Sequence, residues 1–113
     1  MANTFLNAKS DLTTADLTTI YTVPTATTAI VKSILVSEDA GSGTTIDVTL
    51  VDASGNIFSL FKAKAVGSNT TVELLTQPLI LEESEILKVQ AGDANELHVV
   101  ASILQVKPRQ VVT

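Results

Sequence analysis

Hydrophobic residues recur with a period of two along most of this chain, and this alternation constrains the fold more than any other feature. In the segment TTIDVTLVD (44–52), Ile46, Val48 and Leu50 share one face, while polar residues occupy most positions between them. Successive side chains of a strand point to opposite sides, so such alternation is typical of a strand with one buried face. No segment shows a convincing helical period. The sequence therefore predicts an all-β protein.

Similar runs recur along the chain and are separated by turn residues. The expected additional strands cover residues 4–8, 18–23, 29–37, 57–64, 70–75, 79–81, 86–90 and 97–106. Segment 79–89 could also be read as a helix, but its acidic cluster at 82–85 fits a tight turn, which we prefer. Short strands with turns about every ten residues indicate an antiparallel β-sandwich, jelly-roll-like, with about eight strands.

Turn chemistry supports this division. In VDASGN (51–56), Asp52 can accept hydrogen bonds from the backbone that follows it, and Gly55 can take the left-handed conformation of a hairpin turn. The glycines of segment 38–44 predict a flexible loop. A chain of 113 residues is typical of one domain. We expect a single β-sandwich domain over residues 1–106 and a short C-terminal tail over 107–113.

Composition excludes several classes of function. The net charge is −5, and the seven Lys and Arg residues are scattered, so we expect no nucleic-acid partner. The absence of cysteine excludes disulfides and thiolate zinc sites. We identify no signal peptide and no apolar run of about 18 residues, so we expect no membrane partner and synthesis in a cytoplasm.

Candidate catalytic groups are few. His98 is the only histidine, and no nucleophile or orienting acid is evident beside it. The acidic groups at 38–39, 82–85 and 93–96 are interpreted as solvated turn residues. The loop 52–56 begins like a calcium loop, but Ile57 and Ala63 stand where that motif needs Gly and Glu. A weaker calcium site between loops stays open. We expect no catalytic residue, metal or cofactor, and no enzymatic activity.

Two expected strands are apolar on both faces, whereas the outer faces of a sandwich are usually polar. They are NIFSLFKAK (56–64) and ELHVVASILQV (96–106). Part of an outer face is therefore expected to be covered. A homo-oligomer is the simplest cover, and loops or the N-terminal strand are the alternative.

Three segments, MANTFLNAK (1–9), TTIYTVPTATTAIVKSILVSE (18–38) and PLILEESEILKV (78–89), resemble a family of small virion structural proteins of tailed bacteriophages. The resemblance extends from residue 1 to residue 106. It implies a β-sandwich that decorates or connects parts of the particle, and it transfers no catalytic residue.

This resemblance favours a capsid decoration (cement) protein, located on the virion surface after assembly in the host cytoplasm. The expected partners are other copies, as a homotrimer, and the major capsid protein or another virion protein. Neck, tail or baseplate components and a carbohydrate-binding module are the alternatives. We expect segment 3–7 to reach a neighbour as an arm. The expected oligomer or capsid interface contains Asn3, Phe5, Asn7, Phe58, Leu60 and Phe61.

Overall fold

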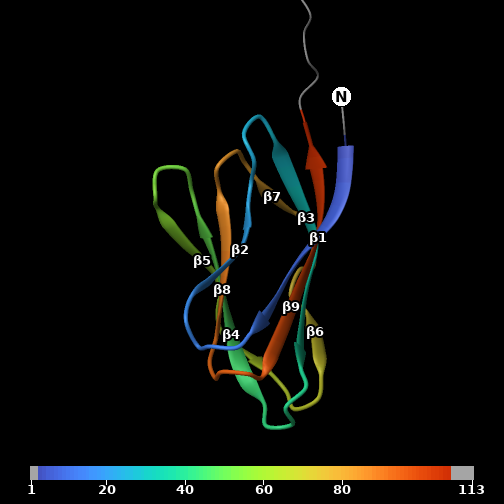
Figure 1. Cartoon of the computed structure of the whole chain (residues 1–113), viewed down its shortest axis with the longest axis vertical. Coiled ribbons are helices and arrows are strands. Elements are labelled where there is room, and N and C mark those ends of the chain that lie inside the picture. The colour runs from blue at the N-terminus through green and yellow to red at the C-terminus, as the bar shows by residue number, and fades with distance from the viewer. Residues whose placement is uncertain (1–2, 108–113) are drawn as a thin grey trace, which may run out of the picture.

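Two antiparallel β-sheets pack face to face in the computed structural model, which describes residues 3–107 (Figure 1). The first sheet contains β1 (Asn3–Leu12), β9 (Leu97–Val106), β3 (Thr28–Glu38), β6 (Thr71–Glu73) and β7 (Leu79–Leu81). The second sheet contains, in spatial order, β2 (Thr18–Thr22), β8 (Ile86–Ala91), β4 (Thr44–Val51) and β5 (Ile57–Val66). The predicted all-β sandwich is confirmed, with nine strands in the described residues.

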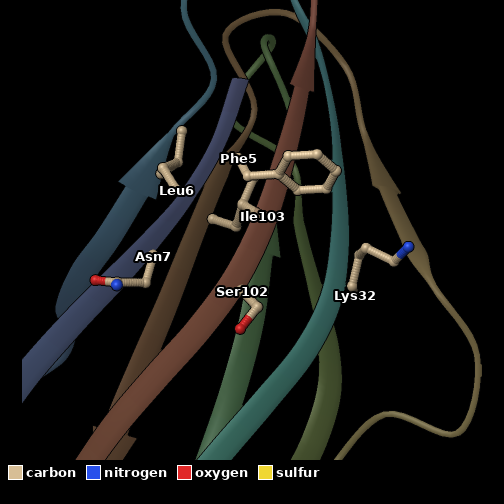
Figure 2. A pocket seen from close by; sticks show the side chains of 6 residues that line it. All are labelled: Phe5, Leu6, Asn7, Lys32, Ser102 and Ile103. Atoms are coloured by element: carbon tan, nitrogen blue, oxygen red, sulfur yellow. The ribbon is translucent and has the colours of Figure 1, made fainter. Parts of the chain in front are cut away.

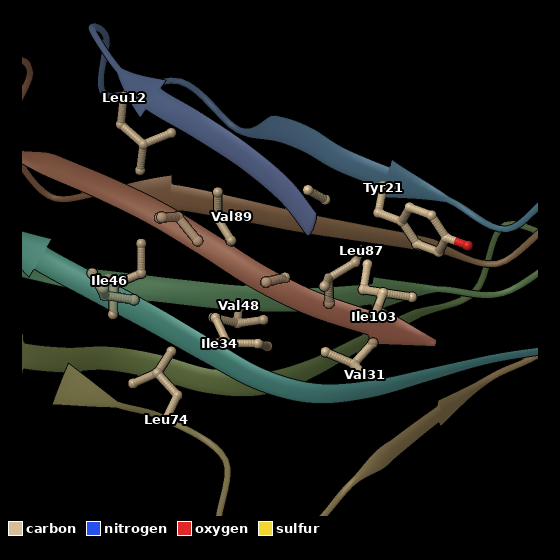
Figure 3. Packing of buried hydrophobic residues seen from close by; sticks show 14 of the residues in the cluster. Leu12, Tyr21, Val31, Ile34, Ile46, Val48, Leu74, Leu87, Val89 and Ile103 are labelled. Atoms are coloured by element: carbon tan, nitrogen blue, oxygen red, sulfur yellow. The ribbon is translucent and has the colours of Figure 1, made fainter. Parts of the chain in front are cut away.

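The core lies between the two sheets and consists almost entirely of aliphatic side chains (Figure 3). Ile46 and Val48 of β4 are fully buried, and Leu50 packs against them from the same face, as the alternation predicts. On the facing sheet, β3 contributes Val31 and Ile34, which are also fully buried. Val31 and Ile34 are three residues apart, and both point inward because the register shifts between Val31 and Ser33. The core therefore follows the period-two pattern of the strands, with an irregularity in β3.

The N-terminal strand is longer than predicted. β1 pairs with β9 over ten consecutive positions, from Asn3 opposite Val106 to Leu12 opposite Leu97. Ala8 and Leu12 are buried, so the inward face continues past the predicted end at residue 8. Segment 3–7 thus belongs to the sheet of its own chain and forms its edge, instead of extending as a free arm.

Both predicted turns have the expected chemistry. The backbone N–H groups of Ser54 and Asn56 donate to Oδ1 of Asp52 at 3.0 and 2.9 Å, and Gly55 has a φ of 88°. Residues 82–85 form a turn between β7 and β8, so the helical alternative is wrong. The proposed C-terminal tail lies outside the described residues beyond Lys107, and the division of the chain at residue 106 stays a proposal.

The acidic residues 38–39 were expected to be solvated turn residues, but Glu38 is buried. Its side chain is only 2% exposed, and its two carboxylate oxygens accept backbone N–H groups of Gly41, Ser42, Gly43 and Asn69 at 2.9–3.3 Å. The hydrogen bond from Asn69, followed by those from the 41–42 backbone, lowers the pKa of Glu38 to about 2, although burial opposes this shift. The predicted flexible loop is therefore anchored to the turn that carries Asn69.

Candidate assembly surface

Four apolar side chains form a row across the outer face of the five-stranded sheet. The register places Phe5 opposite Leu104, Leu104 opposite Ile30, and Ile30 opposite Ile80. Residues that are directly paired in neighbouring strands point to the same face of a sheet. Phe5 is 76% exposed and Ile80 is 52% exposed, while the two central side chains are half-buried by their neighbours. We call these four residues the apolar row.

The row lies on the solvent side because the residues beside it point into the core. The neighbours of Ile30 in β3, Ala29 and Val31, are buried. Ile103, which precedes Leu104 in β9, is also buried. The strand β9 is thus apolar on both faces, as predicted, and β3 shares this property. An exposed row of large apolar side chains on a sheet face is typical of a surface that another molecule covers.

Two hollows flank the row on its opposite sides. Phe5, Asn7, Lys32 and Ser102 line the first, where the Phe5 ring lies over β9 and Lys32 extends from β3 (Figure 2). Lys32 is exposed and sits at a register shift between β3 and β9. This hollow therefore carries a positive charge beside the apolar row.

The second hollow is acidic. Thr28, Ile80, Glu82 and Val106 are among its lining residues, together with the neighbouring Glu83. Because β3 and β7 are antiparallel and Ile30 is opposite Ile80, Lys32 and Glu82 lie on opposite sides of the row. One face of the sheet thus carries an apolar row between a cationic hollow and an acidic hollow.

The remaining predicted interface residues lie on the other sheet. Leu60 and Phe61 of β5 are half-buried and pack against the core, whereas Phe58 is 51% exposed. The adjacent Ile57 is 70% exposed and lies on the same edge strand. The predicted residues therefore fall on two surfaces, the outer face with Asn3, Phe5 and Asn7, and the β5 edge. Their role in an interface stays a prediction.

His98 has acidic neighbours that the sequence did not reveal. Its Nε2 lies 3.2 Å from Oδ1 of Asp11, and its Nδ1 lies 3.4 Å from Oδ2 of Asp39. Asp11 is opposite His98 in the β1–β9 ladder, and Ser37 is opposite His98 in the β3–β9 ladder. Serine, histidine and aspartate thus occupy neighbouring strands.

This cluster lacks the geometry of a catalytic triad. Both ring nitrogens of His98 lie beside carboxylates, Nε2 beside Asp11 and Nδ1 beside Asp39. The Oγ of Ser37 lies 3.2 Å from Oγ1 of Thr71, and no hydrogen bond joins Ser37 to His98 in the described part of the chain, as a catalytic triad would require. We interpret the cluster as a polar link among β1, β9 and the segment after β3.

Other chemistry is sparse in the part of the chain that the structure describes. Within residues 3–107, no group of three His, Asp or Glu side chains is arranged so that it could hold a metal ion. No helix of this region is long and apolar enough to cross a membrane. The single tyrosine, Tyr21, is buried, and its hydroxyl accepts a hydrogen bond from Nε2 of Gln105 at 2.6 Å. It is therefore unavailable as a platform for a sugar ring.

Neither a protein-family model nor a curated protein sequence matches this chain. Solved structures match it in fold. One, from work on Bacillus endospore appendages that form disulfide-linked pili, has a TM-score of 0.60 at 10% identity and covers 96% of this chain and 88% of that one. A structure of infectious bursal disease virus, Gx strain, has a TM-score of 0.51 at 11% identity, with 91% of this chain and 32% of that one covered.

A pentameric capsid protein from metagenomic phage sequences has a TM-score of 0.46 at 19% identity, with 88% of this chain and 58% of that one covered. Similarities at these identities show the fold, a β-sandwich that is also found in a virus and in a pilus structure. They assign no activity to this chain.

Proposed function

We propose that this chain is a non-enzymatic structural protein of a bacteriophage particle. Its proposed role is that of a capsid decoration protein, which binds the outside of the head as a homo-oligomer and stabilises it. The observation that carries the proposal is the apolar row, since Phe5 and Ile80 remain largely exposed on a sheet face that offers no catalytic arrangement. The resemblance of the sequence to small phage virion proteins supports the same class.

The physical logic of such a role fits these surfaces. A protein bound at many equivalent sites gains avidity from modest individual contacts, so it needs complementary surfaces and no reactive group. The apolar row offers a contact between copies. The β5 edge, with Phe58 half exposed, offers a second contact for the major capsid protein or another virion protein.

Symmetry and fold relatives refine the proposal. The trimer expected from the sequence would match three-fold positions of a shell, whereas the outer face of the five-stranded sheet suits a two-fold contact. Sedimentation distinguishes a trimer from a dimer.

A pilus-like fibre is another assembly of copies with this fold. This chain has no cysteine, so disulfide linkage like that of the matched pili has no counterpart here.

An add-back experiment tests the decoration role. Particles that lack this protein would be heated with and without the purified chain, and DNA release would be followed with an intercalating dye. The proposal expects the chain to sediment with heads and to raise the temperature of DNA release. Binding only to tails would instead support a neck, tail or baseplate component, and no binding to either would contradict a virion role.

A glycan array separates the carbohydrate-binding alternative from the structural role. Sugar-binding sites need aromatic platforms or polar loops organised by calcium. Tyr21 is buried, so such a site would depend on the loops. Specific glycan binding that requires calcium would favour this alternative over decoration.

A further inference from the structure

We propose that the apolar row joins two copies of this chain, which pack face to face about a two-fold axis parallel to the row. This inference rests on the proposal that the chain forms a homo-oligomer. It does not depend on which virion component the oligomer binds. The occupant of the outer face is thus a second copy, with its five-stranded sheet stacked on that of the first. Stacked sheets lie about 10 Å apart, which leaves room for one interdigitated layer of side chains.

A two-fold axis along the row places each row residue against its own counterpart. Phe5 then meets Phe5 of the second copy, and Ile80 meets Ile80, so the most exposed apolar side chains are covered together. Residues on one side of the row in the first copy meet residues on the opposite side of the row in the second copy. In β1, Asn7 therefore faces Asn3 of the second copy, and their amides can exchange hydrogen bonds.

Charge complementarity selects this axis. Lys32 is two residues after Ile30, and Glu82 is two residues after Ile80, on the opposite side of the row. The two-fold rotation brings the cationic hollow of one copy onto the acidic hollow of the other. Each dimer then has two symmetric contacts between Lys32 and Glu82. An axis parallel to the strands would also stack the two rows, but it would leave these charges apart.

Two other occupants would cover the same row. Residues 108–113 follow β9 and could place their valines on it, and an unrelated protein could bind there. Neither explains why the two sides of one row carry opposite charges, whereas an isologous contact requires a surface that is complementary to itself. The second copy is therefore the occupant that the observations favour.

A charge-swap experiment tests the contact. Lys32→Glu and Glu82→Lys would be purified separately and studied by sedimentation equilibrium, alone and as an equimolar mixture. Each variant alone has two like-charged contacts per dimer, so its dissociation constant should rise about tenfold or more. In the mixed dimer both contacts regain opposite charges, so the mixture should recover dimers close to the wild-type level.

Only a contact between copies predicts recovery on mixing. A monomeric wild-type chain, a trimer, or two variants that fail to recover when mixed would overturn the proposal. A chain ending at Lys107 should still form the dimer, and loss of the dimer in this variant would mean that residues 108–113, and not the apolar row, join the copies. A wild-type chain that is monomeric but dimerises once it ends at Lys107 would show that these residues occupy the row. Because these measurements use only the purified chain, a failure here leaves the add-back test of capsid decoration unaffected.

Discussion

Replacing Phe5 with serine should dissociate the dimer without unfolding the monomer. Full burial of a phenylalanine side chain contributes about 1.5–3 kcal/mol. Phe5 is 76% exposed in the single chain, so association can bury roughly three quarters of that value. Two copies then contribute about 2–4.5 kcal/mol per dimer, and Phe5→Ser should raise the dissociation constant roughly 30- to 1,600-fold.

Sedimentation equilibrium over a range of concentrations measures this change. Phe58→Ser is the matched control, since Phe58 is also an exposed phenylalanine, 51% exposed, on an edge strand of the other sheet. We expect this control to dimerise like the wild type. Thermal unfolding should show that Phe5→Ser stays folded, because substitutions at exposed positions change stability little. A less than threefold change for Phe5→Ser, or an equal loss for Phe58→Ser, would refute the assignment.

Three further predictions concern stability and chemistry. Ile34 is fully buried, so Ile34→Ala should lower the free energy of unfolding by about 2–5 kcal/mol in urea titration, and a loss below about 1 kcal/mol would contradict its place in the core. The pKa of Glu38 is lowered from 4.5 to about 2, so its ionised form stabilises the fold above pH 4.5, and this contribution declines as the pH falls toward 2. Glu38→Gln should therefore unfold at a lower temperature than wild type at pH 7, and the difference between the two unfolding temperatures should narrow between pH 4.5 and pH 2. A difference that stays constant over this range would contradict the role of the Glu38 carboxylate as the anchor of the loop. The purified chain should hydrolyse a nitrophenyl ester no faster than buffer, and turnover that is lost in both Ser37→Ala and His98→Ala would reveal a hydrolase.

The strands were predictable from the sequence because their signal is local. Alternation in β4 and turn residues such as Asp52 and Gly55 act within a few positions of one another. The predicted bounds of β7 and β9 agree with the structure. The extension of β1 to Leu12 was missed because its last positions are mostly polar, and their strand conformation depends on pairing with β9.

The surfaces were harder to predict because they depend on register between distant strands. Phe5, Ile30, Ile80 and Leu104 are far apart in sequence, and only the pairing of four strands aligns them. Leu104 differs in parity from the buried Val99 and Ile103, and Ile30 differs from its buried neighbours Ala29 and Val31. The register shift between Val31 and Ser33, which brings Ile34 and Val36 into the core at the parity of Ile30, blurs this signal in β3. The anchoring role of Glu38 depends in the same way on Asn69, which comes from another turn.

Immunogold labelling of purified particles tests the central claim most directly. Antibody against this chain would be applied to intact virions and the gold positions read by electron microscopy. Capsid decoration predicts gold spread over the whole surface of the head. Gold confined to one vertex or to the tail, or unlabelled particles despite epitopes shown to be accessible, would contradict it.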